Sequence, residues 1–389
     1  MSLPIPELAP AQHPLERLPE EWAEVLGGWG EPRYRGLQVF QWIHQRGVLD
    51  PDAMTNLPKT LRARLREEGL GLPLTVSHLH PSNDGTRKLL VRMLDGSEVE
   101  TVLIPQLEKV DPDADGDSDE SDEQGTATAA WVPGTVVTQC ISSQVGCAMG
   151  CVFCASGVMG LKRHMTAAEI VSQVLLGRSL TTEREHLRNI VLMGMGEPLH
   201  NYDNVARALV LLTHPEGLAL GKRRVTLSTS GLVPQIDRLA QDFDGQVQLA
   251  ISLHAVTDER RSSIMPINRK HSLDDLMACL KRYPLPKRRR ITIEYTLIRG
   301  VNDDLRDADA LVKLLRGVPA KVNLIPMNPI ADSALAAPRE DGVTAFRERL
   351  FERGLSAFVR KTRGDDIAAA CGQLAYHGDD GRRRRLPVA

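Results

Sequence analysis

Three cysteines, Cys147, Cys151 and Cys154, stand close together in the sequence with the spacing C-x3-C-x2-C. Three thiolates on one loop can bind three irons of a 4Fe–4S cluster, whereas a closed cluster takes four protein thiolates. The fourth iron then stays open for a substrate, as a catalytic zinc ion keeps an open position. The alternative is a zinc knuckle with Cys140 as the fourth ligand, but structural zinc sites favour paired C-x2-4-C units. The spacing therefore favours one open 4Fe–4S cluster per chain.

An aromatic residue, Phe153, directly precedes the last of these cysteines. This arrangement resembles the signature of the radical S-adenosylmethionine (SAM) superfamily. The resemblance implies that the open iron chelates the amino and carboxylate groups of SAM. It also implies that an electron from the cluster breaks the sulfonium bond of SAM.

The composition is that of a soluble globular protein. The chain has 389 residues, enough for two or three domains. The sequence contains no run of 18 apolar residues, so we expect no transmembrane helix. The N-terminus has no basic region followed by an apolar core, so we expect no signal peptide. Six cysteines in a chain of this size do not suggest a disulfide scaffold, and a low-potential cluster needs a reducing compartment. We therefore expect a cytoplasmic protein with no membrane association.

Charge is unevenly distributed along the chain. The formal net charge is -2, but residues 111–123 hold six Asp and two Glu and no basic residue. Without those eight, 48 basic residues stand against 42 acidic ones, a balance of +6. The basic residues gather at 222–224, 287–290, 360–363 and 382–385. A single cluster is most simply a solvated helix end, but four such clusters make a phosphate backbone a serious candidate partner.

Composition and periodicity divide the chain into six segments. We expect a loosely ordered N-terminus, a helical domain, a β extension with a hairpin turn at Asp95-Gly96, a disordered acidic insertion, an α/β core and a basic tail. Their boundaries are 1–20, 21–72, 73–106, 107–130, 131–377 and 378–389.

Strands and helices alternate from residue 131 onward. The expected strands are 135–141, 189–193, 224–228, 247–252, 291–297 and 321–325. The expected helices between them are 166–177, 202–213, 233–240, 273–282 and 304–316. Six β/α repeats predict a parallel sheet with right-handed crossovers, and they are too few for an eight-stranded barrel. The predicted fold class is therefore α/β, a partial (β/α)6 barrel whose cluster loop follows the first strand.

Polar residues and glycines follow several of the expected strands. Each would be an ordinary loop cap alone, but together at one end of a sheet they predict a cofactor pocket. The candidates are Gly196, Glu197, Ser228, Ser252, Leu253, His254 and Asn328. A glycine allows close approach of the backbone to a ligand, and the Glu197 carboxylate could accept a hydrogen bond from the SAM amino group. His254 alone would more often be a packed histidine than a ligand.

Two further cysteines stand outside the triad, Cys140 on the first expected strand and Cys371 near the end of the chain. Either could be a small buried apolar residue. Cys279 lies at helical spacing among apolar residues, where that interpretation is clearly better.

Several stretches together resemble the RlmN/Cfr family of radical SAM RNA methyltransferases. They are Cys140 to Cys147, Gly194 to Leu199 with Asn201, Val225 to Gly231, Ser252 to Ala255, and Arg363 to Asp366 with Cys371 to Leu374. The resemblance covers roughly 21–377, and Arg35 to Trp42 looks like part of the family's accessory domain. The main departure is the acidic insertion at 107–130, which is longer than expected for the family.

The resemblance implies an activity. RlmN-type members methylate carbon 2 of an adenosine in 23S rRNA and of one in certain tRNAs, whereas Cfr-type members methylate carbon 8 of the same rRNA adenosine. Pro198 and Val145 look more like the RlmN type. The family's enzymes use two SAM molecules per turnover and an external electron donor, and we expect a monomer.

The resemblance also implies separate tasks for the remaining site residues. Cys371 would accept a methyl group from one SAM and carry it, as a thiolate nucleophile can. Glu100 would accept the proton from the adenine carbon. Cys140 would form a disulfide with Cys371 and release the methylated RNA. The helical domain and the basic clusters are the expected RNA-contacting surfaces.

Two other classes of function stay open at this point. One is a radical SAM enzyme with a non-RNA substrate, such as a glycyl-radical activase, which would have no need for both Cys140 and Cys371. The other is a non-catalytic, zinc-containing RNA-binding protein.

Overall fold

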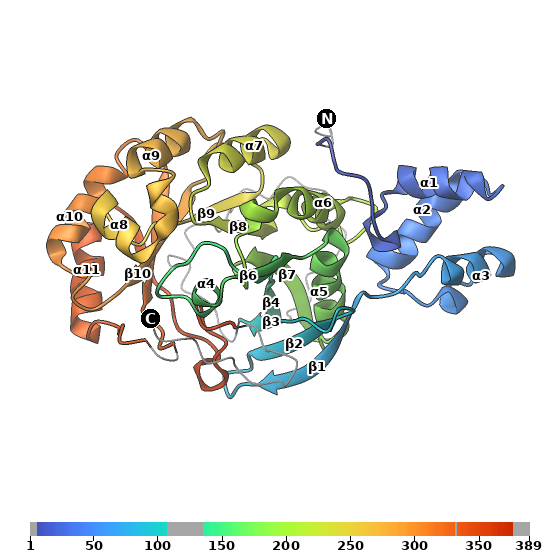
Figure 1. Ribbon diagram of the computed structural model, residues 1–389, viewed down its shortest axis with the longest axis horizontal. Coiled ribbons are helices and arrows are strands. Elements are labelled where there is room, and N and C mark those ends of the chain that lie inside the picture. The colour runs from blue at the N-terminus through green and yellow to red at the C-terminus, as the bar shows by residue number, and fades with distance from the viewer. Residues whose placement is uncertain (1–5, 107–134, 331–332, 376–389) are drawn as a thin grey trace.

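The computed structural model describes residues 6–106, 135–330 and 333–375. A lobe of helices near the N-terminus projects from one side of a curved sheet, and the remaining helices surround the rest of that sheet (Figure 1). No helix in the described ranges is long and apolar enough to cross a membrane.

The centre of the molecule is a ten-stranded sheet in the order β1-β2-β3-β4-β7-β8-β9-β10-β11-β12. The strands from β4 onward are β4 (Thr135–Cys140), β7 (Glu185–Leu192), β8 (Val225–Thr229), β9 (Gln248–Ser252), β10 (Ile291–Leu297), β11 (Ala320–Pro326) and β12 (Ala357–Val359). Neighbours within this set pair in parallel and follow each other in chain order. Because these strands are all parallel, their C-terminal ends lie together at one rim of the sheet. The partial barrel is confirmed, with the three-residue β12 added to the six predicted strands.

Helices connect these strands. They are α5 (Ala167–Ser179), α6 (Tyr202–Thr213), α7 (Val233–Phe243), α8 (Asp258–Ile264), α9 (Leu273–Arg282), α10 (Leu305–Leu314) and α11 (Glu340–Glu352). Figure 1 shows them on the outside of the sheet. Their starts are encoded locally: Thr166 and Glu169 form a capping box at α5, and Ser272 and Asp275 form one at α9.

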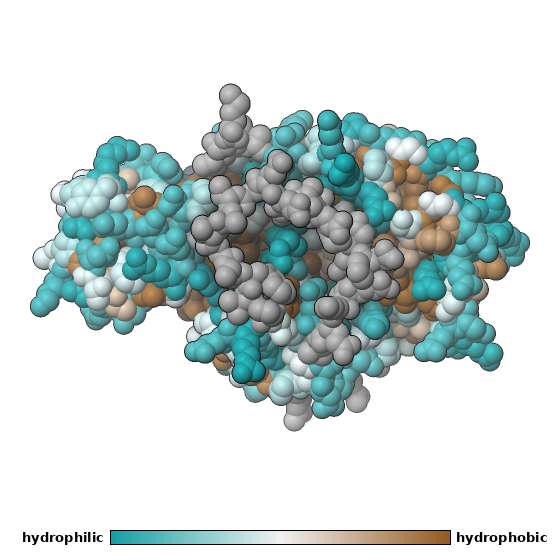
Figure 2. Space-filling view, turned by 180° about the vertical axis from the view of Figure 1, so that it is seen from behind, coloured by the Kyte–Doolittle hydropathy of each residue, from teal (hydrophilic) through white to brown (hydrophobic). Residues whose placement is uncertain are grey.

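The N-terminal lobe consists of α1 (Pro19–Gly28), α2 (Tyr34–Phe40), a π-helical turn η2 (Gln41–Gln45), η3 (Pro51–Ala53) and α3 (Lys59–Glu67). Trp22 and Phe40 are fully buried and belong to the same continuous apolar core as the barrel. Leu61 and Leu65 of α3 face inward, whereas Arg64 and Arg66 are exposed. The visible surface of the lobe is mostly hydrophilic (Figure 2, left).

The expectation of a loosely ordered segment at 1–20 is wrong for residues 14–20. Leu15 and Leu18 are buried, and Pro14–Glu16 form a 3-10 turn, η1. Glu16 Oε1 accepts a hydrogen bond from the Ala168 amide at 2.9 Å, and Arg207 Nη1 donates to the Glu16 carbonyl at 2.8 Å. A short turn with isolated buried leucines has no helical or strand period. The packing of residues 14–20 against the core therefore cannot be recognised from hydrophobic periodicity. The predictions for 107–130 and 378–389 lie outside the described residues.

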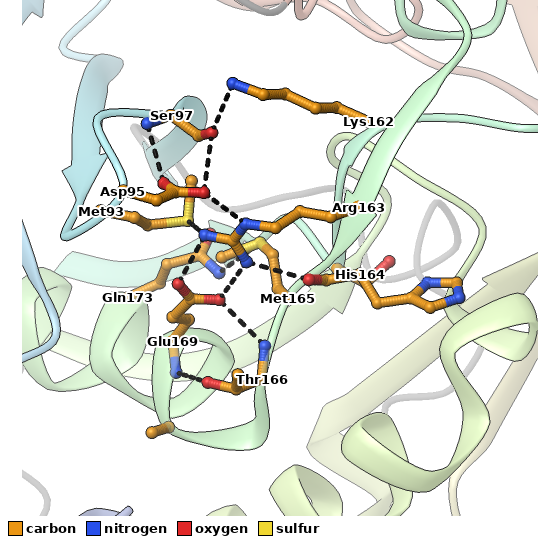
Figure 3. Close-up of polar contacts among 12 residues, drawn as sticks. Met93, Asp95, Ser97, Lys162, Arg163, His164, Met165, Thr166, Glu169 and Gln173 are labelled. Atoms are coloured by element: carbon orange, nitrogen blue, oxygen red, sulfur yellow. Dashed lines mark hydrogen bonds and ion pairs between the residues drawn. The ribbon is translucent and has the colours of Figure 1, made fainter.

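The β extension continues the barrel sheet. It comprises β1 (Leu74–Pro81), β2 (Arg87–Met93) and β3 (Glu98–Pro105), all antiparallel, and β3 pairs with β4 so that Val102 lies opposite Cys140. Its β2–β3 turn is tied to the core through Arg163 (Figure 3). The Arg163 guanidinium bonds to Asp95 Oδ2 at 2.7 Å and to Glu169 Oε1 at 2.8 Å. The extension is therefore fixed relative to the rim of the barrel.

Candidate active site

The three clustered cysteines lie on the loop between β5 (Gln144–Gly146) and α4 (Ala155–Met159). β5 pairs with β6 (Leu161–His164), and the Cys147 amide donates to the Gly160 carbonyl at 3.0 Å. Gly146 has φ +76°, and a Cβ there would lie 2.0 Å from the Gly160 oxygen. Only glycine fits this position, so the loop leaves the hairpin in one defined direction.

All three cysteines line one open cavity. Burial raises the pKa of Cys147 to about 12 and the pKa of Cys151 well above its usual range. Iron binds the thiolate, so a positively charged cluster would have to replace these protons. Among the described residues no three Cys, His, Asp or Glu side chains converge on a single ion. Three cysteines that each bind a different iron need no such convergence, so the donor set fits a 4Fe–4S cluster.

Glu197 lies beside the triad with its carboxylate buried in the same cavity. Its Oε2 accepts from the Ser230 amide at 2.7 Å and its Oε1 from the Leu199 amide at 3.1 Å. Its own amide donates to Gln144 Oε1 at 2.8 Å. Burial raises the pKa of Glu197, and the backbone donors oppose that shift. The carboxylate is therefore held in place as an acceptor for a cationic ligand group.

His254 also lines the cavity, in the left-handed conformation with φ +57°. Its Nδ1 accepts from the Thr296 amide at 2.9 Å, which places the ring hydrogen of the neutral form on Nε2. Its ring meets Phe153 edge-on at 4.7 Å between centroids. Burial lowers the pKa of His254 to about 3, so this residue is neutral at physiological pH.

The structure brings six of the seven predicted cofactor-pocket residues to this cavity. Gly196, Glu197, Ser228, Ser252, His254 and Asn328 line it. Leu253 does not line it: its side chain is fully buried in the apolar core, as alternation along the end of β9 requires.

Several residues of the site were missed by the sequence analysis. Met149, Met193, Met265 and Met327, together with Glu294 and Arg360, line the cavity. Arg261 lies outside it, fully buried, and donates to the carbonyls of Ser230, Ser252 and Leu253 at 2.6, 3.1 and 3.1 Å. Scattered methionines and a single arginine carry no spacing signal. Glu294 lies in the middle of β10, where no strand-end signal marks it, and Arg360 stands out in the sequence only as part of a basic cluster.

A second cavity adjoins the first. Its lining includes the apolar residues Ile104 and Leu374. Arg360, Lys361 and Arg363 lie around it, next to two cysteines, Cys140 and Cys371. One of the four basic clusters of the sequence therefore surrounds a hollow next to these two thiols.

Cys371 is the cysteine that both cavities share. Its carbonyl accepts from Asn328 Nδ2 at 3.0 Å, and the neighbouring Gly372 carbonyl accepts from the Ala155 amide at 2.8 Å. Cys140, at the end of β4, lines the second cavity but not the first. Burial, and then the proximity of Cys371, raise the pKa of Cys140 to about 12. All six cysteines are unpaired.

Glu100 lies in neither cavity lining. Its carboxylate is buried on β3, with Oε1 2.9 Å from Lys88 Nζ and Oε2 accepting from the Ala375 amide at 2.9 Å. The structure thus brings Glu100 under the chain segment that carries Cys371 but does not aim it into either hollow.

Comparison with known proteins agrees with this geometry. Residues 141–312 match the radical SAM superfamily, and residues 19–69 match the ribosomal RNA large subunit methyltransferase N-terminal domain. The chain is 60% identical to a dual-specificity RNA methyltransferase RlmN from Sorangium cellulosum, over 96% of this chain and 98% of that protein. It is 46% identical to the RlmN of Geobacter sulfurreducens, over 91% and 89% of the two chains.

A solved structure extends the comparison to the fold. The crystal structure of a radical SAM methyltransferase from Sphaerobacter thermophilus matches with a TM-score of 0.81 at 43% identity, over 94% of this chain and 99% of that one. These matches leave no support for a non-catalytic zinc protein or for a radical SAM enzyme that acts on a substrate other than RNA. The chain belongs to the RlmN family of RNA methyltransferases, within the radical SAM superfamily.

Proposed function

We propose that this protein methylates carbon 2 of an adenosine in 23S rRNA, and of one in certain tRNAs, through a methyl group carried on Cys371. The observation that carries the proposal is the distribution of the cysteines. Cys147, Cys151 and Cys154 line the first cavity, Cys140 lines the second, and Cys371 lines both. A carrier that collects a group in one hollow and delivers it in the next has to face both.

The first cavity suits SAM. Glu197 and the strand ends around it offer acceptors for the amino group, and the methionines offer apolar contacts. Two SAM molecules are used per turnover, one as methyl donor and one as radical source. When bound by the three clustered cysteines, a 4Fe–4S cluster would supply the electron for reductive cleavage of SAM. An external electron donor would have to provide that electron.

The first task of Cys371 is to accept the methyl group. Its thiolate attacks the methyl carbon of SAM, a carbon–sulfur bond forms, and the sulfonium bond to S-adenosylhomocysteine breaks. Carbon 2 of adenine is electron-poor and cannot attack SAM directly, which is why a carrier is needed. A hydrogen atom then passes from the S-methyl group to the 5′-deoxyadenosyl fragment of a second SAM. The remaining carbon radical on Cys371 adds to carbon 2.

Release of the product falls to Cys140. Its sulfur bonds to that of Cys371 as the carbon–sulfur bond to the RNA breaks. The carbon 2 proton passes to a base, the methylene carbon takes up a proton to become the methyl group, and the one electron left over passes to the external electron carrier. By resemblance the proton acceptor is Glu100. For that role its carboxylate would have to leave the Ala375 amide, which it binds at 2.9 Å. The resulting Cys140–Cys371 disulfide must be reduced before the next turnover.

The second cavity suits a nucleotide that has left its stack. A flipped base needs an apolar pocket, and the attached phosphates need cations. The apolar lining residues Ile104 and Leu374 and the basic residues Arg360, Lys361 and Arg363 supply both. The helical lobe carries further exposed arginines, Arg64 and Arg66 on α3.

Carbon 2 is preferred over carbon 8 because the similar proteins are named RlmN and because Pro198 and Val145 are of the RlmN type. The test is anaerobic incubation of reconstituted protein with reductant, methyl-labelled SAM and fragments of 23S rRNA or tRNA. Nucleoside mass spectrometry should find labelled 2-methyladenosine. Labelled 8-methyladenosine would assign the Cfr-type reaction, and the absence of any labelled nucleoside on either RNA would overturn the proposal.

A further inference from the structure

A buried ion pair lies under the segment that carries Cys371. Lys88 on β2 and Glu100 on β3 are only 5% and 1% exposed, and Lys88 Nζ lies 2.9 Å from Glu100 Oε1. In the strand register Leu90 lies opposite Glu100, so Lys88 is a diagonal neighbour of Glu100. Side chains so related project from the same face of a sheet.

The pair touches both ends of one loop. Lys88 Nζ donates to the Ala368 carbonyl at 3.3 Å, and Glu100 Oε2 accepts from the Ala375 amide at 2.9 Å. Cys371 lies between these two points. The segment 368–375, which we name the carrier loop, is thus held at its ends by two side chains of the β extension.

Other contacts hold the middle of the carrier loop. Asn328 Nδ2 donates to the Cys371 carbonyl at 3.0 Å, and Ser156 Oγ donates to the Leu374 carbonyl at 2.6 Å. These contacts come from the barrel rim and from the cluster-side helix α4. The carrier loop is therefore held by the β extension, by the barrel rim and by α4. Among these contacts of the described residues, only those from the ion pair involve charged side chains.

A buried ion pair is a poor means of adding stability. Removing two charges from water costs about as much as their attraction returns, and apolar replacements are often as stable. A pair that bonds the backbone at two defined points instead fixes the position of the segment between those points. Because β2 and β3 continue the barrel sheet and their turn is tied to α5 through Arg163, the pair is itself on a rigid support.

We propose that Lys88 is a positioning residue for methyl transfer: together with Glu100 it holds the two ends of the carrier loop, so that Cys371 faces both cavities. The proposal rests on the proposed function, since it concerns the carrier role of Cys371. Lys88 itself touches neither cavity. Its loss should misplace the thiol without changing the cluster site.

The test compares Lys88→Met with Lys88→Arg and with Arg87→Met. Arg87 is the matched control, because it is the next residue on β2 and is also ion-paired, to Glu185, but bonds the α5–β7 connection instead of the carrier loop. In reconstituted protein, three quantities are measured: bound iron, reductant-dependent SAM cleavage, and methylation of Cys371 by peptide mass spectrometry. Hydrogen exchange of residues 368–375 reports on the loop itself.

We expect Lys88→Met to keep its iron and its SAM cleavage but to methylate Cys371 about 100-fold more slowly, since small misplacements of reacting atoms cost that much. Exchange in the carrier loop should become faster. Lys88→Arg should recover most of the methylation rate, and Arg87→Met should behave as wild type in both measurements.

The outcomes separate the two proposals. If wild-type protein never methylates Cys371, the proposed function fails irrespective of Lys88. If wild type does methylate Cys371 and Lys88→Met matches it in rate and in loop exchange, the positioning role is overturned. Should Lys88→Met not fold because the Glu100 carboxylate has lost its lysine, Lys88→Met combined with Glu100→Leu removes both charges. That variant should show the same slow methylation, a step that precedes any proton acceptance by Glu100, and wild-type methylation in it would equally refute the role.

Discussion

Cys140 and Cys371 line the same cavity, but only Cys371 also lines the cavity of the three clustered cysteines. The two thiols are close enough that Cys371 adds to the effect of burial in raising the pKa of Cys140, and Cys140 is the more deeply buried of the two. This arrangement gives them different access to the cofactor and common access to whatever occupies the second cavity. Their variants should therefore fail in different ways.

Cys371→Ala should form no covalent RNA adduct, because it has no carrier for the methyl group. Cys140→Ala should still load the methyl group and add it to RNA, and should then stay cross-linked through Cys371 because nothing breaks the carbon–sulfur link. Denaturing gels after expression, with and without ribonuclease, test this. A ribonuclease-sensitive shift is expected for Cys140→Ala only; retained methylation without any shift in Cys140→Ala would make Cys140 a packed core residue.

Alanine at any one of Cys147, Cys151 or Cys154 should abolish cluster binding and activity. An open cluster has only three protein thiolates, so no spare ligand can replace a lost one. Iron and sulfide analysis after anaerobic reconstitution measures the effect, with Cys279→Ala as the control because Cys279 lies on α9, away from the cavity. About four irons per chain in any variant of the triad would contradict the assignment.

Much of this site could be predicted because its residues lie at strand ends. The predicted strand 291–297 has the bounds of β10, and Glu197, Ser252 and Asn328 lie at or just after the C-terminal ends of strands that meet at one rim. The β5–β6 hairpin and β12 were not predicted, because three- and four-residue strands have no readable period. The position of Glu100 under the carrier loop depends on pairing between β3 and β4, and such long-range pairing leaves no local pattern.

Acidification should destabilise the protein partly through His44. This histidine is fully buried in the helical lobe against Phe40, and burial lowers its pKa from 6.5 to about 3. Between these values the unfolded chain binds a proton that the folded chain does not. The stability contribution is complete above pH 6.5 and is lost as pH falls toward 3, by up to about 1.4 kcal/mol per pH unit.

His44→Leu tests that sign. Urea unfolding at several values between pH 7 and pH 5 should show a shallower loss of stability in the variant than in wild type, whatever its stability at pH 7. Equal slopes would mean that His44 becomes protonated in the folded protein.

Arg261 should strengthen SAM binding although it does not line the cavity. Its guanidinium donates to the Ser230 carbonyl at 2.6 Å, and the Ser230 amide donates to Glu197 Oε2 at 2.7 Å. Burial lowers the pKa of Arg261 to about 10, so it stays charged at neutral pH. Arg261→Met leaves buried carbonyls without donors, at a cost of about 1–3 kcal/mol each, and removes the contact that holds the backbone of Ser230, whose amide bonds Glu197.

The expected result for Arg261→Met is a lower melting temperature and SAM binding weakened at least about tenfold, which corresponds to 1.4 kcal/mol, with iron content unchanged. Arg260→Met is the matched control: the Arg260 side chain is about half exposed and pairs with the buried Asp307, so this variant also loses an ion pair but no contact to Ser230. Equilibrium binding of SAM to the reconstituted protein measures the effect. If Arg261→Met bound SAM as tightly as Arg260→Met, the network from Arg261 through Ser230 to Glu197 would have no part in holding the carboxylate for its ligand.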